Sequence, residues 1–174
     1  YRGLEHEDEM VGYLPHCTFG LNPRAASIDT PLHAFIPKAH VDHMHPDAVI
    51  AIAASRDSER LTKEVFGGEI GWLPWQRPGF DLGLKLEAMA KGHPSLKGIV
   101  LAGHGLFTWG DTARECYQQT LRVIQMAADH LASKGKAEPF GGAVAKPLDE
   151  AGQAAFLAEL AVGIRTVWAA RDED

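Results

Sequence analysis

Histidines form the most suggestive chemical pattern in this chain. Nine occur among 174 residues, and His43 and His45 are separated by a single residue. Residues at i and i+2 of a β-strand project from the same face, so both imidazoles can reach one ion. By the same alternation His40 and Asp42 face the other way, and we expect them to support the site from behind or to lie at the surface. The alternative is a pair of polar histidines without a ligand, because so short a motif also occurs by chance.

A third histidine strengthens the metal interpretation. His104 lies between two glycines, after the apolar run GIVLAG (98–103), and we expect it at the end of a buried strand with room beside its ring. Pro46 ends the strand directly after His45, at a strand-to-helix junction where ligand-binding residues commonly lie. Three imidazoles leave one position of a tetrahedral zinc ion open, as catalysis requires. The pattern therefore predicts that His43, His45 and His104 bind Zn²⁺ or another divalent metal.

A carboxylate upstream is a candidate for proton transfer. Asp29, in the segment SIDTPLH (27–33), can complete the metal shell or act as a base. Asp before Thr-Pro is also a common turn residue, so a purely structural role stays open. The histidines without any supporting pattern are expected to be solvated: His6, His16, His93 and His130.

A hydrolase motif is a competing reading of the same histidines. The metallo-β-lactamase pattern H-x-H-x-D-H matches His43, His45 and Asp47. Ala48 stands where the last histidine is required, and Asp47 falls in the first turn of a predicted helix. The match therefore fails where a second metal would need its ligand.

Strands and helices alternate around these residues. The sequence predicts strands over 40–44, 69–76, 98–103 and 106–109, and a broken segment with three prolines over 17–37. It predicts helices over 4–14, 57–66, 80–91 and 148–171, and one directly after Pro46. Another helix begins at Thr112 with a capping box to Glu115, and its apolar stripe includes Cys116 and Tyr117. The pattern is that of an α/β domain, and no G-x-G-x-x-G dinucleotide fingerprint occurs.

Composition excludes several classes of protein. Seventeen Lys and Arg against 23 Asp and Glu give a net charge of −6, which argues against a nucleic-acid partner but permits a small anionic substrate. Only Cys17 and Cys116 occur, so neither a disulfide framework nor a C-x-x-C metal site can form. The apolar stretches are too short to span a membrane and no signal peptide opens the chain, so we expect a cytoplasmic protein.

Two segments together resemble the class II aldolase/adducin family. They are HMHPDAVIAIAA (43–54) and GIVLAGHGLFTWG (98–110), and the resemblance covers about residues 4–135. The segment 22–55 is similar to the aldolase part of bifunctional rhamnulose-1-phosphate aldolase/lactaldehyde dehydrogenase proteins. The resemblance implies a three-layer α/β/α fold with a central, mainly antiparallel sheet. It also implies that residues 1–174 form one such domain without its N-terminal portion, ending in a helix at 148–174.

The same resemblance implies roles for individual residues. His43, His45 and His104 match the family's zinc ligands. Asp29 stands where the family has its catalytic glutamate, in the pattern acid-x-x-x-His, and is one methylene shorter. Ser27 matches the first of two serines that hold the substrate phosphate, whereas isoleucine replaces the second. No tyrosine occurs in residues 57–80, where some members place a proton donor for a neighbouring subunit.

The implied activity is a zinc-assisted retro-aldol cleavage in carbohydrate metabolism, such as rhamnose catabolism. A ketose 1-phosphate similar to rhamnulose 1-phosphate would yield dihydroxyacetone phosphate and an aldehyde such as lactaldehyde, in a homo-oligomer that is a tetramer by resemblance. A sugar-phosphate epimerase or dehydratase on the same fold is one alternative. A non-enzymatic adducin-like interaction module is another, but such a module would not need all three histidines.

Overall fold

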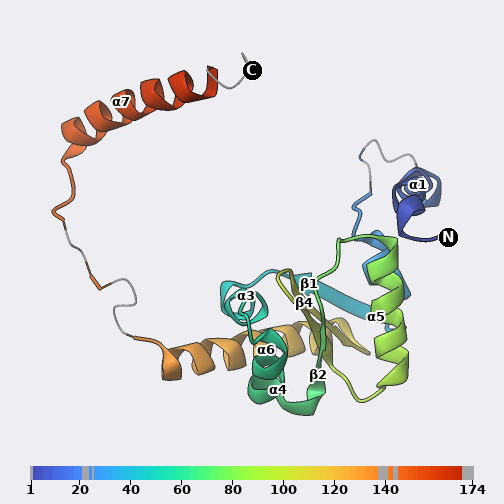
Figure 1. The fold of residues 1–174 in the computed structure, drawn as a ribbon. Helices are drawn as coiled ribbons and strands as arrows, with labels where there is room; N and C mark the ends of the chain where they lie inside the picture. The colour runs from blue at the N-terminus through green and yellow to red at the C-terminus, as the bar shows by residue number, and fades with distance from the viewer. Residues whose placement is uncertain (1, 21–23, 25, 137–140, 143–144, 170–174) are drawn as a thin grey trace. The chain divides into compact units, whose positions relative to one another are not determined.

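The computed structural model describes residues 2–20, 24, 26–136, 141–142 and 145–169 (Figure 1). Contacts divide the chain into two units, Tyr1–Gly135 and Lys136–Asp174. The first unit contains strands β1 (His40–Met44), β2 (Ile70–Leu73), β3 (Gly98–Leu101) and β4 (Gly105–Gly110). Its helices are α1 (Glu7–Val11), α2 (Thr30–Phe35), α3 (Asp47–Ala53), α4 (Ser58–Phe66), α5 (Phe80–Gly92) and α6 (Ala113–Lys134), with short 3-10 turns at Leu4–His6, Leu14–Cys17 and Gly67–Glu69. The second unit contains α7 (Glu150–Ala169).

The four strands form one mixed sheet in the order β1-β4-β3-β2. β4 pairs antiparallel with both β1 and β3, and β2 pairs parallel with β3. The sheet is therefore mainly antiparallel, as expected. The β1–β4 register places His43 opposite Phe107 and Met44 opposite Leu106, which brings the histidine motif to the start of β4.

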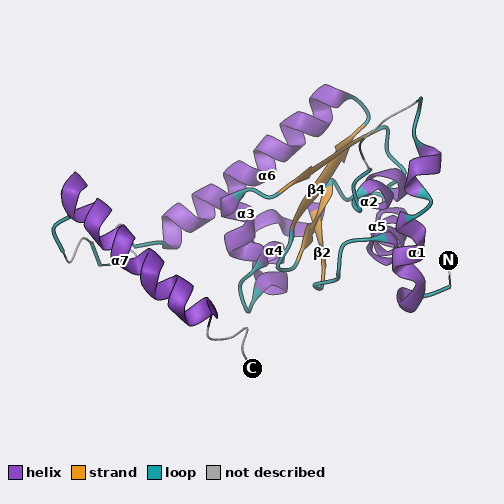
Figure 2. Ribbon diagram, turned by 90° about the horizontal axis from the view of Figure 1, so that it is seen from above, coloured by secondary structure: helices purple, strands orange, loops and turns teal. Residues whose placement is uncertain are grey.

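Helices cover both faces of the sheet, with α2 and α5 on one side and α3, α4 and α6 on the other (Figure 2). The alternation of side chains along the strands divides the core into two clusters. Ile99 and Leu101 pack with the α2 and α5 side, whereas Val100 between them packs with the α3, α4 and α6 side. Five hydrophobic residues of β3 and β4 are less than 3% exposed, including Phe107 and Leu106 on opposite faces. The expected three-layer α/β/α arrangement is confirmed.

Several predicted elements coincide with the observed ones. The strand over 40–44 is β1, and the helix after Thr112 is α6. Its capping box is present: the Thr112 hydroxyl accepts the backbone N–H of Glu115 at 3.2 Å, and the Glu115 carboxylate accepts that of Thr112 at 3.1 Å. The predicted helix over 148–171 is observed as α7, and residues 170 and 171 lie outside the described residues.

Other local predictions were wrong. The segment 17–37 contains the helix α2, which begins with Pro31 in its first turn. The predicted strand over 98–103 is observed as the buried strand β3, but it ends at Leu101, so His104 lies in the turn between β3 and β4. Cys116, Thr120 and Val123 form the buried face of α6. Tyr117 follows Cys116 by one residue, so its side chain is turned away from that face and is 60% exposed.

Within the described residues, no helix combines the length and the apolar composition that are needed to cross a bilayer.

Candidate metal centre

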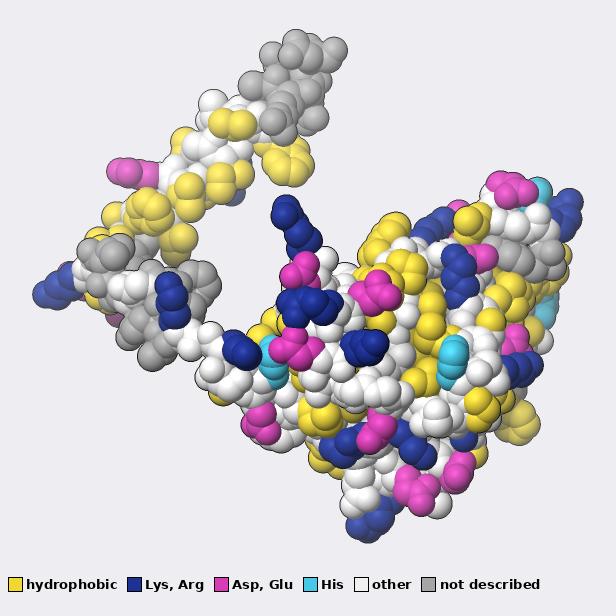
Figure 3. Space-filling model, turned by 60° about the horizontal axis from the view of Figure 1, so that its bottom comes forward, with side chains coloured by type: hydrophobic (Ala, Val, Ile, Leu, Met, Phe, Trp, Pro, Cys, Tyr) yellow, Lys and Arg dark blue, Asp and Glu magenta, His cyan; other side chains and the backbone are white. Residues whose placement is uncertain are grey.

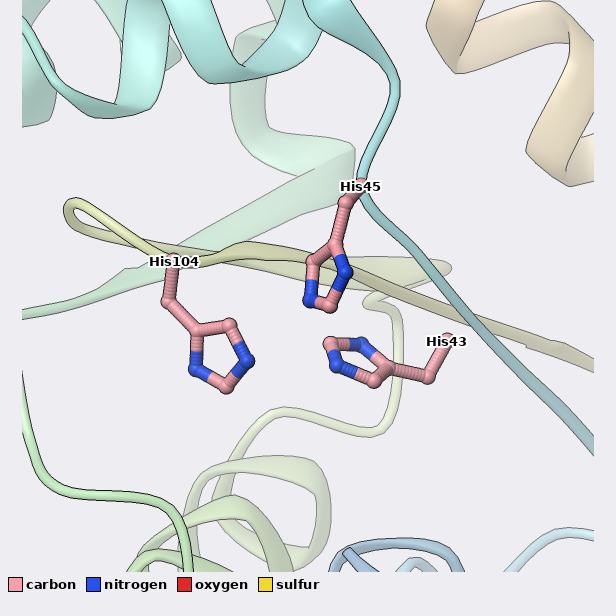
Figure 4. A group of neighbouring side chains, drawn as sticks. All are labelled: His43, His45 and His104. Atoms are coloured by element: carbon pink, nitrogen blue, oxygen red, sulfur yellow. The ribbon is translucent and has the colours of Figure 1, made fainter. Parts of the chain in front are cut away.

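Three histidines from separate parts of the chain meet at one end of the sheet. His43 belongs to β1, His45 directly follows that strand, and His104 lies in the turn between β3 and β4. One ring nitrogen of each lies within 4.8 Å of the corresponding nitrogens of the other two. The ring centroids are 4.5, 5.0 and 5.1 Å apart, and Figure 4 shows the rings pointing toward a common centre.

Glycines on either side of His104 make this convergence possible. Gly103 has φ of 63°, a left-handed conformation that glycine adopts without strain, and its N–H donates to the carbonyl of Ala53 at 2.8 Å. At Gly105, a Cβ atom would lie 2.5 Å from His45 Cδ2 and 2.9 Å from the Met44 carbonyl oxygen. The imidazole of His45 therefore occupies the space that a side chain at position 105 would fill.

The orientation of His43 is set by the strand beside it. Its Nδ1–H donates to the carbonyl of Leu106 at 3.1 Å, and its ring stacks on Phe107 with centroids 4.1 Å apart and planes 9° apart. The side chain of Leu106 points to the opposite face of the sheet, where it is buried among the residues that pack against α3 and α6. The hydrogen bond leaves Nε2 of His43 as the ring's free lone pair.

Two buried ring nitrogens of the cluster have no hydrogen-bond partner among the described residues. They are Nε2 of His43 and Nδ1 of His104. A buried polar atom without a partner costs free energy. Nε2 of His43 faces the common centre, where a metal ion would satisfy its lone pair, whereas Nδ1 of His104 lies on the side of its ring away from that centre (Figure 4). Neutral imidazole is a common zinc ligand, and three of them leave a position open for substrate or water. The donor set therefore fits a divalent metal.

Burial favours the neutral form of two of these rings, His43 and His104. Burial is the main cause that lowers the pKa of His43 to about 4; the neighbouring His45 and His104 also lower it, whereas the Leu106 hydrogen bond and Asp29 act in the opposite direction. Burial is also the main cause of the lowered pKa of His104, followed by the proximity of His45. Both rings consequently keep their metal-binding lone pairs at neutral pH.

The predicted catalytic and phosphate-binding residues lie together at the start of α2. Ser27 donates its hydroxyl to the Asp29 carboxylate at 3.4 Å, and its oxygen accepts the N–H of Asp29 at 3.1 Å. Asp29 is the N-cap of α2, but its side chain makes no capping hydrogen bond to the helix. The carboxylate stands outside the group of three converging histidines, yet its charge partly opposes the lowering of the His43 and His104 pKa values that burial causes.

A cavity of about 490 Å³ lies beside this pair. It is lined by Ser27, Asp29, Thr30, His33 and Ala34. The ring of His33 lies edge-on to His43, with centroids 6.2 Å apart, and edge-on to Phe107 at 5.4 Å. His33 thus forms the border between the cavity and the metal centre.

His33 and Phe107 contribute to the site although the sequence patterns assigned them no role. Their contact with the metal centre depends on the fold of α2 and on the β1–β4 register, which no local pattern encodes. His40 is exposed. Asp42 faces away from the histidines, as expected, and its carboxylate accepts the Thr120 hydroxyl at 3.0 Å, which ties β1 to α6.

Comparison with known proteins agrees with this geometry. A family model described as "Class II Aldolase and Adducin N-terminal domain" matches residues 5–131. The chain belongs to the class II aldolase and adducin family. Uncharacterized oxidoreductase YuxG of Bacillus subtilis (strain 168) is 37% identical over 160 residues, which cover 91% of this chain and 23% of that protein.

Two solved structures share the class II aldolase fold. The N-terminal class II aldolase domain of a conserved protein from Thermoplasma acidophilum has a TM-score of 0.63 at 33% identity, over 71% of this chain and 57% of that one. A sugar-phosphate aldolase from Thermotoga maritima has a TM-score of 0.54 at 18% identity, over 63% of this chain and 55% of that one. The chain thus spans little more than half of these structures and about a quarter of the curated relative.

Proposed function

We propose that this protein is a zinc-dependent class II aldolase of the cytoplasm. It would cleave a ketose 1-phosphate, similar to rhamnulose 1-phosphate, into dihydroxyacetone phosphate and an aldehyde such as lactaldehyde. The observation that carries the proposal is the convergence of three imidazoles, among which the buried Nε2 of His43 faces the common centre without a partner among the described residues. An interaction module has no use for three imidazoles that converge on one point, whereas a metal-dependent lyase uses such a set to hold its ion.

The three histidines would hold the ion. An ion held there would supply Lewis-acid stabilisation of the negative charge that develops on the ketose oxygen during C–C cleavage. His43 is fixed for this task by its hydrogen bond to Leu106 and its stacking on Phe107, and His45 by the space that Gly105 leaves. Because these histidine side chains are held rigidly, they would bind the ion in one defined geometry and would not rearrange during the reaction.

Asp29 would carry the proton that retro-aldol cleavage transfers. The ketose hydroxyl that becomes the aldehyde carbonyl must lose its proton, and the carbon released from the broken bond must gain one. The Asp29 carboxylate lines the cavity that His33 borders and makes no capping bond to α2, so its oxygens remain available to a substrate. The Ser27 hydroxyl donates its hydrogen bond to one of the two Asp29 carboxylate oxygens, Oδ2.

Ser27 would contribute to binding of the substrate phosphate. Its hydroxyl lines the same cavity and can rotate from Asp29 to a phosphate oxygen. Isoleucine at position 28 supplies no second hydroxyl, so other groups would complete the phosphate site. We further propose that the protein acts as a homo-oligomer, a tetramer by family resemblance.

The decisive experiment measures zinc content and triose phosphate release on the purified chain. Rhamnulose 1-phosphate is offered as substrate, and dihydroxyacetone phosphate is detected by a coupled NADH-dependent reductase. We expect zinc-dependent release, and a decrease in kcat of about 10²- to 10⁴-fold in Asp29→Asn with unchanged zinc content. Interconversion of sugar phosphates without triose phosphate would instead identify an epimerase, and absence of bound zinc would contradict a metal-dependent enzyme.

A further inference from the structure

A hollow of about 370 Å³ lies at the end of the sheet opposite to the metal centre. Lys38 and Lys97 line it shortly before β1 and β3 begin, whereas His45 and His104 follow the same two strands. The end of β4 and one side of α6 supply its other walls: Trp109, Gly110, Asp111, Glu115, Gln118, Gln119 and Arg122. The hollow is therefore separate from the metal centre and shares no residue with the cavity beside Asp29.

The side-chain amide of Gln119 indicates that the hollow has a ligand. Its Oε1 accepts the Nε–H of Arg122 at 3.3 Å, so Nε2 lies on the other side of the amide group. Nε2 is buried and has no hydrogen-bond partner among the residues that the structure describes. A buried donor without an acceptor costs free energy. A ligand with acceptor atoms, bound in the hollow that Gln119 lines, would remove that cost.

The two lysines of the hollow lack close carboxylate partners. Within the described part of the chain, the ammonium group of Lys97 makes neither a hydrogen bond nor an ion pair. Nζ of Lys38 lies 3.9 Å from Oδ1 of Asp111, beyond hydrogen-bond distance. Elsewhere Lys and Arg side chains commonly lie beside Asp or Glu (Figure 3), as in the pair of Arg60 and Glu64 at 2.6 Å. The cations of the hollow therefore differ from paired surface cations.

The other carboxylates near the hollow have partners of their own. Oε2 of Glu115 accepts the backbone N–H groups of Asp111 and Thr112 at 3.2 and 3.1 Å, as part of the capping box of α6. Glu69 pairs with Arg122. Two ammonium groups and one amide group thus remain as donors in need of acceptors. Such a set favours a ligand with several negatively charged oxygen atoms.

We propose that this hollow is a binding site for a phosphate group. Lys38, Lys97 and Gln119 would donate to its oxygens, which present acceptors in several directions. The hollow has roughly ten times the volume of one water molecule, so it has room for the organic part of a phosphate ester. The net charge of −6 does not oppose such a site, because local cations determine the potential there. The site does not depend on the proposed function.

The first test follows the side-chain amide resonances of Gln119 by NMR while inorganic phosphate is added to the full chain. Their absence from the spectrum of Gln119→Leu assigns them, and we expect saturable shifts at millimolar phosphate. Lys97→Met keeps the aliphatic stem without the charge and should raise the dissociation constant at least about threefold. Lys91→Met is the matched control, because that ammonium group pairs with Glu87 on α5, and it should bind phosphate like the unaltered chain. Absence of any shift, or equal affinity of Lys97→Met and the unaltered chain, would overturn the proposal.

The second test separates this hollow from the metal centre and determines the source of the phosphate group. His104→Ala lacks a candidate metal ligand at the other end of the sheet, so phosphate should shift the Gln119 amide resonances in this variant as in the unaltered chain. Loss of those shifts in His104→Ala would contradict a separate site. Glycerol 3-phosphate is then titrated in place of inorganic phosphate. Tighter binding of glycerol 3-phosphate would assign the hollow to phosphate esters, whereas equal or weaker binding would assign it to the free ion.

Discussion

His43 combines three properties in one side chain. It is a candidate metal ligand, its Nδ1 is bonded to Leu106, and its ring is stacked on Phe107. These contacts bury the ring, and burial makes its protonated form unfavourable. Proton binding and the fold are therefore linked at this residue, in a direction that can be measured.

We expect the metal-free chain to lose stability as the pH falls from about 6.5 to about 4. In the unfolded chain His43 has the ordinary pKa of 6.5, and in the folded chain its pKa is about 4. Between these values the unfolded chain binds a proton that the folded chain does not, so the free energy of unfolding decreases. Well above 6.5 and well below 4 this group contributes no slope. Urea unfolding at about pH 7.5, 6 and 5 measures the effect.

The matched control for the pH series is His43→Gln, which lacks the titrating ring. Its free energy of unfolding should depend less on pH over the same interval. Equal pH dependence of both chains would show that other groups are responsible, among them His104, whose pKa burial shifts in the same direction.

Removal of a candidate ligand should abolish tight metal binding. His104→Ala leaves two imidazoles at the centre, and we expect zinc affinity to fall more than about 100-fold. Competition with a chromophoric chelator measures it. His93→Ala, at an exposed histidine outside the cluster, should bind zinc like the unaltered chain. One zinc ion per chain in His104→Ala at micromolar concentration would contradict the ligand assignment.

At the scale of single residues, the sequence predicts which histidines lie close together but not which side chains surround them. The side-by-side position of His43 and His45 follows from the two-residue period of a strand, and the structure shows it. The stacking of His43 on Phe107 depends on the register between two strands far apart in the sequence, and a shift of one residue would place Leu106 there instead.

At the scale of elements, the turn between β3 and β4 determines where the third imidazole lies. The predicted strand over 98–103 ends at Leu101, since Gly103 needs a left-handed conformation that a strand does not provide. The helix α2 was not predicted because Pro31 reads as an interruption. Proline is, however, well tolerated in the first turn of a helix, where α2 places it.

Gly105→Ala should damage both fold and metal centre. The new methyl group would lie 2.5 Å from His45 Cδ2 and 2.9 Å from the Met44 carbonyl, so the ring or the strand must move. We expect a loss of about 1–3 kcal/mol in the free energy of unfolding. Zinc binding should weaken by at least about tenfold, as ligand displacement implies.

Gly68→Ala is the control for that substitution, because a Cβ atom at Gly68 meets nothing within 4 Å. Urea unfolding and zinc titration of both variants give the comparison. Unchanged zinc affinity in Gly105→Ala would show that the space at position 105 is not needed by His45.

At the scale of the whole molecule, a single sheet joins two hydrophobic clusters. Leu86 of α5 packs on one face, and Ile52 of α3 packs on the other. Periodicity along the sequence indicated an α/β domain, because long amphipathic helices and buried strands are readable locally. The strand order β1-β4-β3-β2 was not readable, because it is decided by contacts between distant segments.

Both clusters should unfold together. Leu86→Ala and Ile52→Ala each remove a fully buried side chain and should cost about 2–5 kcal/mol. Because both pack on one sheet, each should shift a single transition seen alike by circular dichroism and tryptophan fluorescence. Leu84→Ala, at a partly exposed position of the same helix α5, should cost less than about 1 kcal/mol. Separate transitions for the two clusters would contradict a shared core.

Leu106 connects the metal centre on one face of the sheet with the hydrophobic cluster on the other face. Its carbonyl orients His43 on one side, while its side chain fills the layer beneath α3 and α6 on the other. Mutations of buried residues in the cluster that packs against α3 and α6 would therefore change the metal affinity, although these residues contact no metal ligand. Over evolutionary time, the interior on the side away from the metal centre is then constrained in its divergence by chemistry as well as by packing.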